Sequence, residues 1–352
     1  MSEKNSSAGQ KLKSVLIFLV KIGVSLGILA FLVYRAAQNE ETMNGLLHGE
    51  KIWSSLALGF FFTFLAVLGT IIRWWWLVRI QKMNAGFWST LRIGYIGYLF
   101  NLAPMGIVGG DLLKAWLLTR HEKKNHPHAG SVILGSVFVD RMFGLYALFM
   151  MASLVILGLG ILWNPQTSAT LRSASWAVLV AWGVGTIAGL AILCPPPSRK
   201  ELPPPRSKAE EIFRRIADSV RLYRNYPLQL GLVLLVSLLI HTSFATSLYF
   251  LADGIWRAND PPTFVQHLYV SPISMAMSAV PLPVGPVEVV FDELYRDVTG
   301  NTGMGLVVML AYRFICLVTA LLGVVFYFCA REEIRETMQE QQKKEGSEEN
   351  ES

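Results

Sequence analysis

The sequence is poor in charged residues and in cysteine. Of its 352 residues only 16% are Asp, Glu, Lys or Arg, whereas 53% are hydrophobic and the mean hydropathy is +0.42. Such a composition excludes a soluble globular protein and is typical of a membrane protein. The three cysteines, Cys194, Cys316 and Cys329, lie in or beside apolar runs without metal-ligand spacing, so neither a disulfide framework nor a zinc site is expected.

Motifs that would mark several other functions are also missing. The sequence contains no nucleotide-binding loop and no D-x-D-like pair of acidic residues in a connecting loop. His121, His126 and His128 lie among lysines, where a solvated basic loop is a better interpretation than a metal site. We therefore expect no cofactor, no metal ion and no nucleic acid partner.

Long apolar runs are what the chain has in abundance. A helix needs about 20 apolar residues to cross a hydrocarbon core about 30 Å thick. Six runs approach or exceed this length: residues 15–34, 53–72, 131–162, 176–194, 229–251 and 304–329. Two further apolar stretches, residues 91–120 and 267–297, contain Pro, Gly and charged residues. The first run follows lysines as a signal peptide would, but no small-residue cleavage site follows it, so we interpret it as an uncleaved helix.

The distribution of Lys and Arg selects one threading of these runs through the membrane. If both interrupted stretches are hairpins that return to the side they came from, 23 basic residues fall inside and 5 outside. A single crossing by residues 91–113 would instead place the basic segment 195–228 outside. Two full crossings by residues 91–120 would need about 60 Å, whereas a helix of that length extends only about 45 Å.

The expected architecture is therefore an all-α polytopic membrane helix bundle with six full spans and two re-entrant helical hairpins. Residues 1–14 form a cytoplasmic N-terminal segment, and residues 15–330 form a single membrane domain. Residues 331–352 form a charged, disordered cytoplasmic tail. We expect a multi-pass protein of the cell membrane with both termini in the cytoplasm.

The two halves of the predicted bundle echo each other. The span 53–72, the hairpin 91–120 and the span 131–162 run in directions opposite to those of 229–251, 267–297 and 304–329. A short sequence echo accompanies this threading, PMGIVGGD at 104–111 against PVGPVE at 283–288. Together they indicate a candidate inverted repeat, as in secondary transporters, whose substrate sites lie at broken helices near the membrane midplane.

The first hairpin has the features of an anion site. Gly109, Gly110 and Asp111 begin its returning half-helix, whose free N–H groups and positive dipole end favour a phosphate. The two glycines would let such a group approach the backbone closely. Lys114 shares a helix face with Asp111 and offers a cation.

The second hairpin and two of the spans add further charges at membrane depth. Gly285 and Glu288 begin the second returning half-helix, and Arg141 and Arg313 lie well inside apolar runs. Intramembrane charges are costly and therefore mark candidate substrate-binding residues. The alternative for Arg141 is snorkelling to the cytoplasmic face or a local ion pair, and for Arg313 a structural pair with Glu288 or Asp292.

Two further polar features have competing interpretations. His241 lies mid-span beside Ser and Thr residues, where a proton site competes with a simple interhelical hydrogen bond. The segment RWWWLVR at 73–79 is interpreted as an aromatic and basic anchor at the membrane interface and not as a ligand site.

Several motifs, in this order, resemble the lysylphosphatidylglycerol synthetase transmembrane region family, which is flippase-like. They are LAP at 102–104 with GGDLLK at 109–114, VDR at 139–141, PLPVG at 281–285 with Glu288, and YR at 312–313. The resemblance extends over nearly the whole chain. The chain departs from the family at Lys114, where arginine is frequent, and at 286–287, where Pro-Val replaces a second glycine. Lysine keeps the charge but loses bidentate phosphate geometry.

The resemblance implies a protein that moves a phosphate-bearing lipid between leaflets, such as an aminoacylated phospholipid or a polyprenyl-linked sugar. Its partner would be a membrane lipid with an anionic head group, and a separate lipid-modifying or glycosyltransferase enzyme could act with it. The alternatives are an integral-membrane transferase that uses Asp111 or Glu288 as a base, and a non-catalytic partner subunit. We expect no transferase domain after residue 330, which favours translocation over covalent chemistry.

Overall fold

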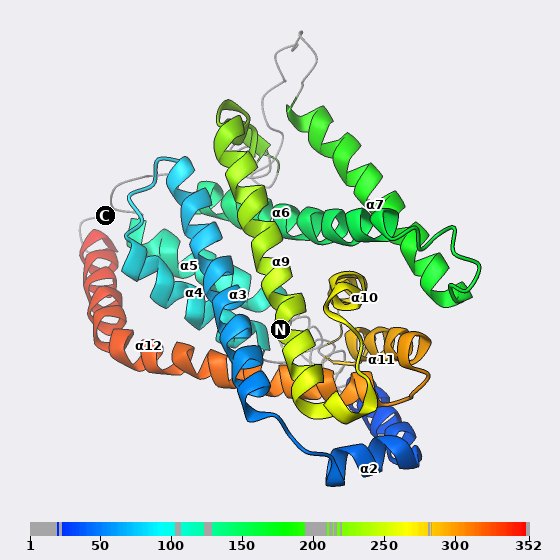
Figure 1. The fold of residues 1–352 in the computed structure, drawn as a ribbon. Coiled ribbons are helices and arrows are strands. Elements are labelled where there is room, and N and C mark those ends of the chain that lie inside the picture. Colours follow the sequence, from blue (N-terminus) through cyan, green and yellow to red (C-terminus); the bar gives the residue numbers. More distant parts are fainter. Residues whose placement is uncertain are drawn as a thin grey trace, which may run out of the picture.

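The computed structural model describes residue 20 and residues 23–102, 107–122, 129–193, 210, 214, 217–218, 220–280, 282 and 284–349. Within these residues all regular structure is helical (Figure 1). The predicted all-α class is therefore confirmed.

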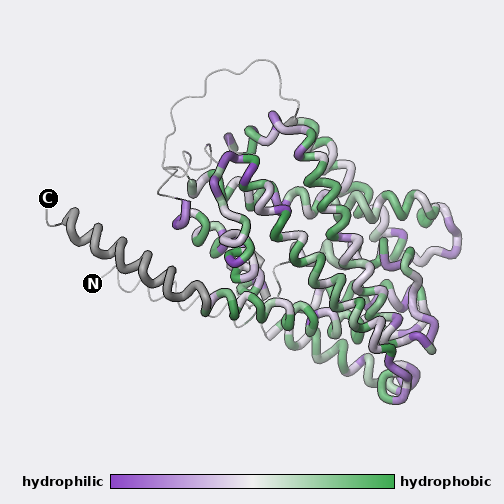
Figure 2. The backbone as a smooth tube through the Cα atoms, turned by 60° about the vertical axis from the view of Figure 1, so that its left-hand side comes forward, coloured by the Kyte–Doolittle hydropathy of each residue, from purple (hydrophilic) through white to green (hydrophobic). Residues whose placement is uncertain are grey.

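Among the described residues, five helices are long and apolar enough to cross a membrane. They are α3 (Trp53–Ile80), α6 (Ala129–Gly158), α7 (Ala169–Leu193), α9 (Pro227–Trp256) and α12 (Met304–Glu349). Figure 2 shows that hydrophobic residues run along these helices and that hydrophilic residues gather mainly at their ends and in the connections. These helices correspond to five of the six predicted spans.

The sixth predicted span, residues 15–34, lies partly outside the described residues. Its described part belongs to the apolar helix Gly23–Ala37, here called the N-terminal helix. The helix α2 (Glu40–His48) follows, and the Asn39 side chain caps it by accepting a hydrogen bond from the Thr42 backbone N–H at 2.9 Å.

Each interrupted stretch forms a pair of short helices. α4 (Phe87–Leu102) and α5 (Ile107–Glu122) have 16 residues each, and α10 (Phe264–Ala276) and α11 (Pro286–Thr299) have 13 and 14. Such helices extend only about 20–24 Å, less than the thickness of a hydrocarbon core. The members of each pair pack against each other, so each pair is a helical hairpin. Pro104 lies outside the described residues.

Short 3₁₀ turns complete the described connections. They are η1 (Tyr223–Asn225), η2 (Arg257–Asn259) and η3 (Met277–Ala279). Proline begins α9 and α11, where its missing N–H costs nothing, and the residue after α11 is Gly300 in the left-handed conformation.

The two halves of the bundle repeat the same set of helix contacts. In the first half, α4 packs on α12, and both α5 and α3 pack on α6. In the second half, the corresponding helix α10 packs on α6, and both α11 and α9 pack on α12. The order span, hairpin, span is therefore present twice with equivalent neighbours. This is the arrangement that an internal repeat produces, and it supports the repeat predicted from the sequence.

The two halves meet where α3 and α9 lie side by side in the middle of the molecule (Figure 1). Gly59 lies against Leu251, near the start of α3 and the end of α9, whereas Gly69 lies against Ile240 further along. The two helices are therefore antiparallel, so the second half is inverted relative to the first. Glycine at these positions brings the helix axes together, as is common between membrane helices.

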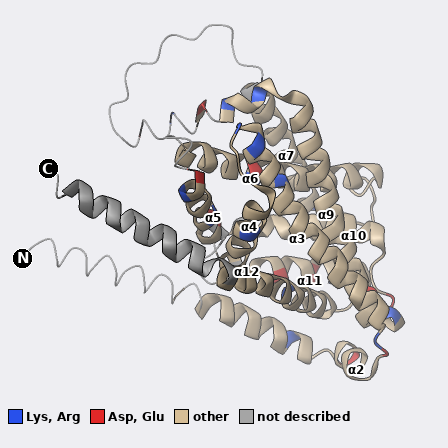
Figure 3. Cartoon of the chain, turned by 90° about the vertical axis from the view of Figure 1, so that its left-hand side faces the viewer, with Lys and Arg blue, Asp and Glu red and all other residues tan. Residues whose placement is uncertain are grey.

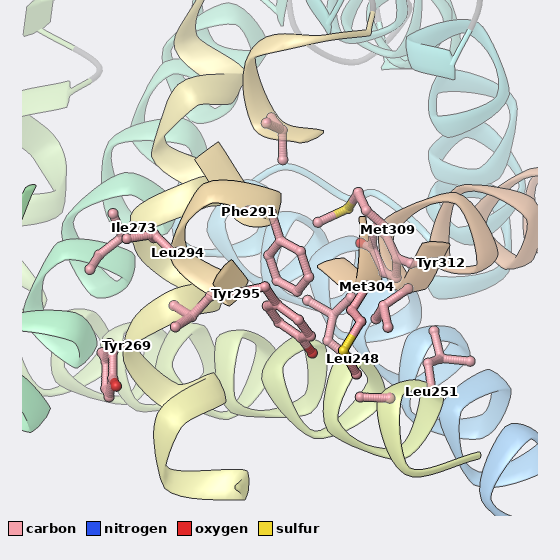
Figure 4. Close-up of a cluster of buried hydrophobic side chains, with 14 of the residues drawn as sticks. Leu248, Leu251, Tyr269, Ile273, Phe291, Leu294, Tyr295, Met304, Met309 and Tyr312 are labelled. Atoms are coloured by element: carbon pink, nitrogen blue, oxygen red, sulfur yellow. The ribbon is translucent and has the colours of Figure 1, made fainter. Parts of the chain in front are cut away.

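The largest apolar core joins the helices of the second half and also includes residues of α6 and α7 (Figure 4). Leu248 of α9, Tyr269 of α10, Phe291 and Tyr295 of α11 and Met309 of α12 meet in it and are almost fully buried. This packing fixes α11 against α12 and thereby sets the position of the charged residues that these two helices carry.

The charged tail differs from the prediction. Residues 331–352 were expected to be disordered, but α12 continues as a helix to Glu349. The segment contains no proline and is rich in Glu, Gln, Lys and Arg, which are good helix formers. Its low hydrophobicity kept it from being recognised as part of the last helix.

Candidate functional site

An ion-pair cluster joins the first hairpin to α6. Arg141 of α6 donates from Nε to Oδ2 of Asp111 on α5 at 2.5 Å, and Lys114 Nζ lies 3.0 Å from Oδ1 of the same carboxylate. The Asp111 side chain is buried, whereas that of Arg141 is 43% exposed. The predicted Asp111, Lys114 and Arg141 are thus brought together, with two cations on one carboxylate.

Lys114 is held in place by an aromatic ring as well as by Asp111. Its Nζ lies 4.7 Å from the centroid of a Trp74 ring, a favourable cation–π position. Trp74 is itself buried and donates to the Ser136 hydroxyl. The ammonium therefore points into the space between α3 and α5.

The glycines of the first hairpin lie inside the helix and not before it. α5 begins at Ile107, so Gly109 and Gly110 belong to its first turns. A Cβ on Gly110 would lie 2.1 Å from the Gly97 carbonyl oxygen and 2.4 Å from Asn101 Oδ1. The space beside the Gly110 Cα is therefore occupied by α4, and close packing of α4 on α5 requires glycine at this position.

A second carboxylate–arginine pair joins the second hairpin to α12. Arg313 donates from Nε to Oε1 of Glu288 at 2.7 Å, and its Nη2 lies at the same distance from this oxygen. The Glu288 side chain is fully buried and that of Arg313 is 33% exposed. Of the two partners predicted for Arg313, the structure selects Glu288.

The start of α11 is closed by its own carboxylate. Gly285 has φ 123°, which favours glycine, and its N–H donates to Oε2 of Glu288 at 2.7 Å. Glu288 therefore uses one oxygen for the helix N-terminus and the other for Arg313. Asp292 has a different role, because its Oδ1 accepts from the backbone N–H groups of Gly303 and Leu306 at the start of α12.

The two pairs occupy equivalent places in the two halves. Asp111 and Glu288 lie near the starts of α5 and α11, and their arginine partners lie well inside α6 and α12, the helices that follow. Figure 3 shows how few charged residues interrupt the rest of the helical surface. A buried carboxylate that holds one side of a guanidinium leaves other N–H groups of that guanidinium free to bind an anion.

His241 lies away from both pairs. Its Nε2 is 2.8 Å from the Gly144 carbonyl oxygen of α6, which makes an interhelical hydrogen bond. The interhelical hydrogen bond that the sequence offered as the alternative to a proton site is therefore present. His241 joins α9 to α6 next to a third charged pair.

This third pair, Arg73 with Asp140, was missed in the sequence. Arg73 Nε donates to Asp140 Oδ1 at 2.8 Å and Nη1 donates to the Ser237 hydroxyl at 3.0 Å. Arg73 is only 5% exposed, so its interpretation as an interface anchor is wrong. α3 extends to Ile80, beyond the apolar run that ended at residue 72, and this places Arg73 inside the bundle. Arg79 is exposed, with its Cζ 5.9 Å from a Trp75 ring centroid.

Comparison with known families agrees with this architecture. A profile of the lysylphosphatidylglycerol synthase TM region family matches residues 18–323, a range that contains both hairpins and all three charged pairs. The comparison with curated proteins finds no match. The match covers most of the chain and the five long apolar helices agree with it. The chain therefore belongs to the lysylphosphatidylglycerol synthase TM region family and is a multi-pass membrane protein.

Proposed function

We propose that this protein moves a membrane lipid with a phosphate-bearing, anionic head group from one leaflet to the other. The observation that carries the proposal is the repeated carboxylate–arginine pair, Asp111 with Arg141 and Glu288 with Arg313. Both arginines are partly exposed and lie well inside apolar segments, where an unused cation is costly unless it serves a ligand or a water-filled path. The family name, which refers to a phospholipid synthase, supports a lipid as the cargo.

The charge balance of the first cluster favours an anionic head group. Lys114 and Arg141 carry two positive charges against the single negative charge of Asp111, whereas Glu288 and Arg313 balance each other. A phosphate group near Arg141 would neutralise the excess and accept charge-assisted hydrogen bonds that replace its hydration. Gly109, Gly110 and Gly285 contribute to this site by shaping the half-helices that carry the carboxylates.

In this proposal the two hairpins are re-entrant and the lipid passes along them. Their helices are too short to cross a hydrocarbon core, and broken helices at membrane depth are a common place for substrate sites in inverted-repeat transporters. The sequence contains no nucleotide-binding loop, so net movement follows a lipid or proton gradient. In the second case His241 or Glu288 would be the group that carries the proton.

The decisive experiment is lipid exchange in proteoliposomes without ATP. The purified protein should speed the movement of fluorescent phosphatidylglycerol between leaflets more than that of fluorescent phosphatidylcholine. Arg141→Gln should remove most of this difference, whereas Arg79→Gln, an exposed arginine outside the site, should not. Equal acceleration of both lipids, or of neither, would contradict the proposal and leave a transferase or a partner subunit as the better interpretation.

The natural lipid is a separate question that cells can answer. Mass spectrometry of lipids exposed on each side of the membrane, compared between a deletion strain and its parent, should show one phosphate-bearing lipid redistributed. An aminoacylated phospholipid and a polyprenyl-linked sugar differ in mass and fragmentation, so the same measurement distinguishes them.

A further inference from the structure

Arg141 is exposed on the surface of α6, although it lies well inside this apolar helix. It follows the start of α6 by 12 residues, which corresponds to a depth of about 18 Å along the helix. Its neighbours Phe138 and Met142 on α6 are exposed apolar residues. Within the described chain its guanidinium makes one hydrogen bond, through Nε, and its Nη groups make none. A guanidinium that faced hydrocarbon in this way would be strongly disfavoured.

A line of exposed side chains leads from Arg141 to the end of α5. Leu112 is 55% exposed and Trp116 is 45% exposed, and Arg120 lies four residues beyond Trp116 on the same side of the helix. The Arg120 Cζ is 3.9 Å from a Trp116 ring centroid, so a cation–π contact holds the guanidinium next to these exposed side chains. The distance from Asp111 to Arg120 along the helix is about 14 Å. Together with Phe138, Arg141 and Met142, these residues form what is here called the α5/α6 face.

The equivalent surface of the second half is covered. Val289 follows Glu288 as Leu112 follows Asp111, but Val289 packs with Leu32 of the N-terminal helix and Leu306 of α12. Arg35 of the same N-terminal helix pairs with Glu293. Glu293 lies four residues after Val289, just as Trp116 lies four residues after Leu112. No helix of the described chain covers Leu112 in this way, because it remains more than half exposed. Among the described residues, the equivalent surface is therefore covered in the second half and uncovered in the first.

We propose that the α5/α6 face is the route by which an anionic phospholipid reaches the site from the leaflet at the C-terminal end of α5. Arg120 attracts the phosphate at the membrane surface, and the Nη groups of Arg141 receive it at mid-depth. The acyl chains remain in the bilayer against Leu112, Phe138 and Met142. This inference rests on the proposed function for its cargo, but it concerns where the lipid lies and can be tested without transport.

The test measures which lipid lies beside position 112. In a variant with the three native cysteines replaced by serine, Leu112→Cys carries a fluorophore, and the full-length protein is placed in phosphatidylcholine vesicles. A small fraction of the lipid is either phosphatidylglycerol or phosphatidylcholine with a nitroxide on its acyl chain. Phosphatidylglycerol should be enriched at position 112 by about tenfold over phosphatidylcholine, because charge-assisted hydrogen bonds to Arg141 hold it there.

Matched variants separate the route from general lipid contact. The same label at Ile187 on α7, a 71% exposed apolar position, should be quenched equally by the two lipids. Arg141→Gln should abolish the enrichment at position 112, and Arg120→Gln should reduce it about two- to fivefold, as expected for a partly exposed cation. Arg79→Gln removes another arginine that lies near a tryptophan ring and should leave the enrichment unchanged.

The outcomes for the route and for the proposed function are independent. Equal quenching by both lipids at position 112, or equal effects of Arg120→Gln and Arg79→Gln, would overturn the route even if Arg141→Gln stops lipid exchange. Enrichment at position 112 in a protein that exchanges no lipid between leaflets would support the route as a binding face and contradict the proposed function.

Discussion

At the scale of single residues, the three carboxylate–arginine pairs described above differ in how many N–H groups of the arginine remain available to another anion. Arg73 is almost fully buried and bonds to both Asp140 and Ser237. Arg141 and Arg313 each bond to one carboxylate and remain partly exposed. A fully enclosed pair can only hold helices together, whereas a half-open pair can exchange its carboxylate for another anion. We therefore propose a structural role for the Arg73 pair, and in the proposed function the other two pairs bind the lipid head group.

The structural assignment of Arg73 predicts a specific pattern of stabilities. Asp140→Asn alone leaves the Arg73 charge buried without its partner and should destabilise the protein by about 3–5 kcal/mol. The double variant Arg73→Met with Asp140→Leu removes both charges and should recover most of that stability. Thermal unfolding in detergent measures both. If the single and double variants are equally unstable, burial of an unpaired charge is not the cause.

The binding assignment of Arg313 predicts that stability and activity separate. Arg313→Gln leaves Glu288 fully buried and unpaired, so both unfolding temperature and lipid exchange should fall. The double variant Glu288→Gln with Arg313→Gln should regain the unfolding temperature while exchange stays low. A double variant that exchanges anionic lipid at the unmutated rate would show that this pair is only structural.

The sequence predicted the charged residues of the site better than their surroundings. Asp111, Lys114, Glu288 and Arg313 stand out because charge is rare in apolar runs, and the structure pairs each of them. The burial of Arg73 could not be predicted from the rarity of charge in an apolar run. An arginine followed by three tryptophans fits an interface as well as a helix interior, and only the continuation of α3 to Ile80 decides between them.

At the scale of helices, the first hairpin depends on the approach of two backbones. Gly110 of α5 lies against the Gly97 carbonyl of α4, and Gly97 in turn lies against Lys114. The glycine pair therefore brings α4 close to the part of α5 that carries Asp111 and Lys114. The sequence showed that these glycines were unusual, but a ligand and a neighbouring helix are equally good reasons for a missing side chain.

Gly110→Ala should therefore separate α4 from α5. Its Cβ would meet the Gly97 carbonyl oxygen at 2.1 Å, and because that atom is backbone a whole helix must move. We expect a lower unfolding temperature and slower lipid exchange. Gly231→Ala is the control, since nothing lies within 4 Å of a Cβ there and alanine should stabilise α9 by about 0.5–1 kcal/mol. Equal behaviour of the two variants would contradict the packing role of Gly110.

At the scale of the whole molecule, the count of basic residues predicts an orientation in the membrane that labelling can test. Asn84, between α3 and α4, and Gln166, after α6, are both exposed, and the predicted threading places them on opposite sides of the membrane. Asn84→Cys should react with a membrane-impermeant maleimide from the cytoplasmic side only, and Gln166→Cys from the outer side only. The opposite pattern would invert the threading without changing the fold.

If the protein moves lipid as proposed, the repeat also gives a reason why, among the described residues, one face is uncovered and the other covered. In an inverted repeat the two halves can exchange conformations, so a surface that is open in one half corresponds to a surface that opens in the other at a different stage of transport. Here the N-terminal helix covers the α11/α12 side through Leu32, which packs against Leu306. If the α11/α12 side must open for the lipid to leave, this contact has to break during each cycle.

A reversible cross-link tests whether the cover moves. Leu32→Cys with Leu306→Cys, oxidised to a disulfide, should stop most lipid exchange, and a reductant should restore it. The control joins α6 to α7 through Tyr146→Cys with Thr186→Cys, whose hydroxyl groups are 3.1 Å apart, and should leave exchange unchanged because α7 lies outside the repeat. Both cross-links can be confirmed by the mass of the linked peptides. Unchanged exchange with the first cross-link in place would mean that lipid enters and leaves without opening the α11/α12 side, and that the open α5/α6 face serves both leaflets.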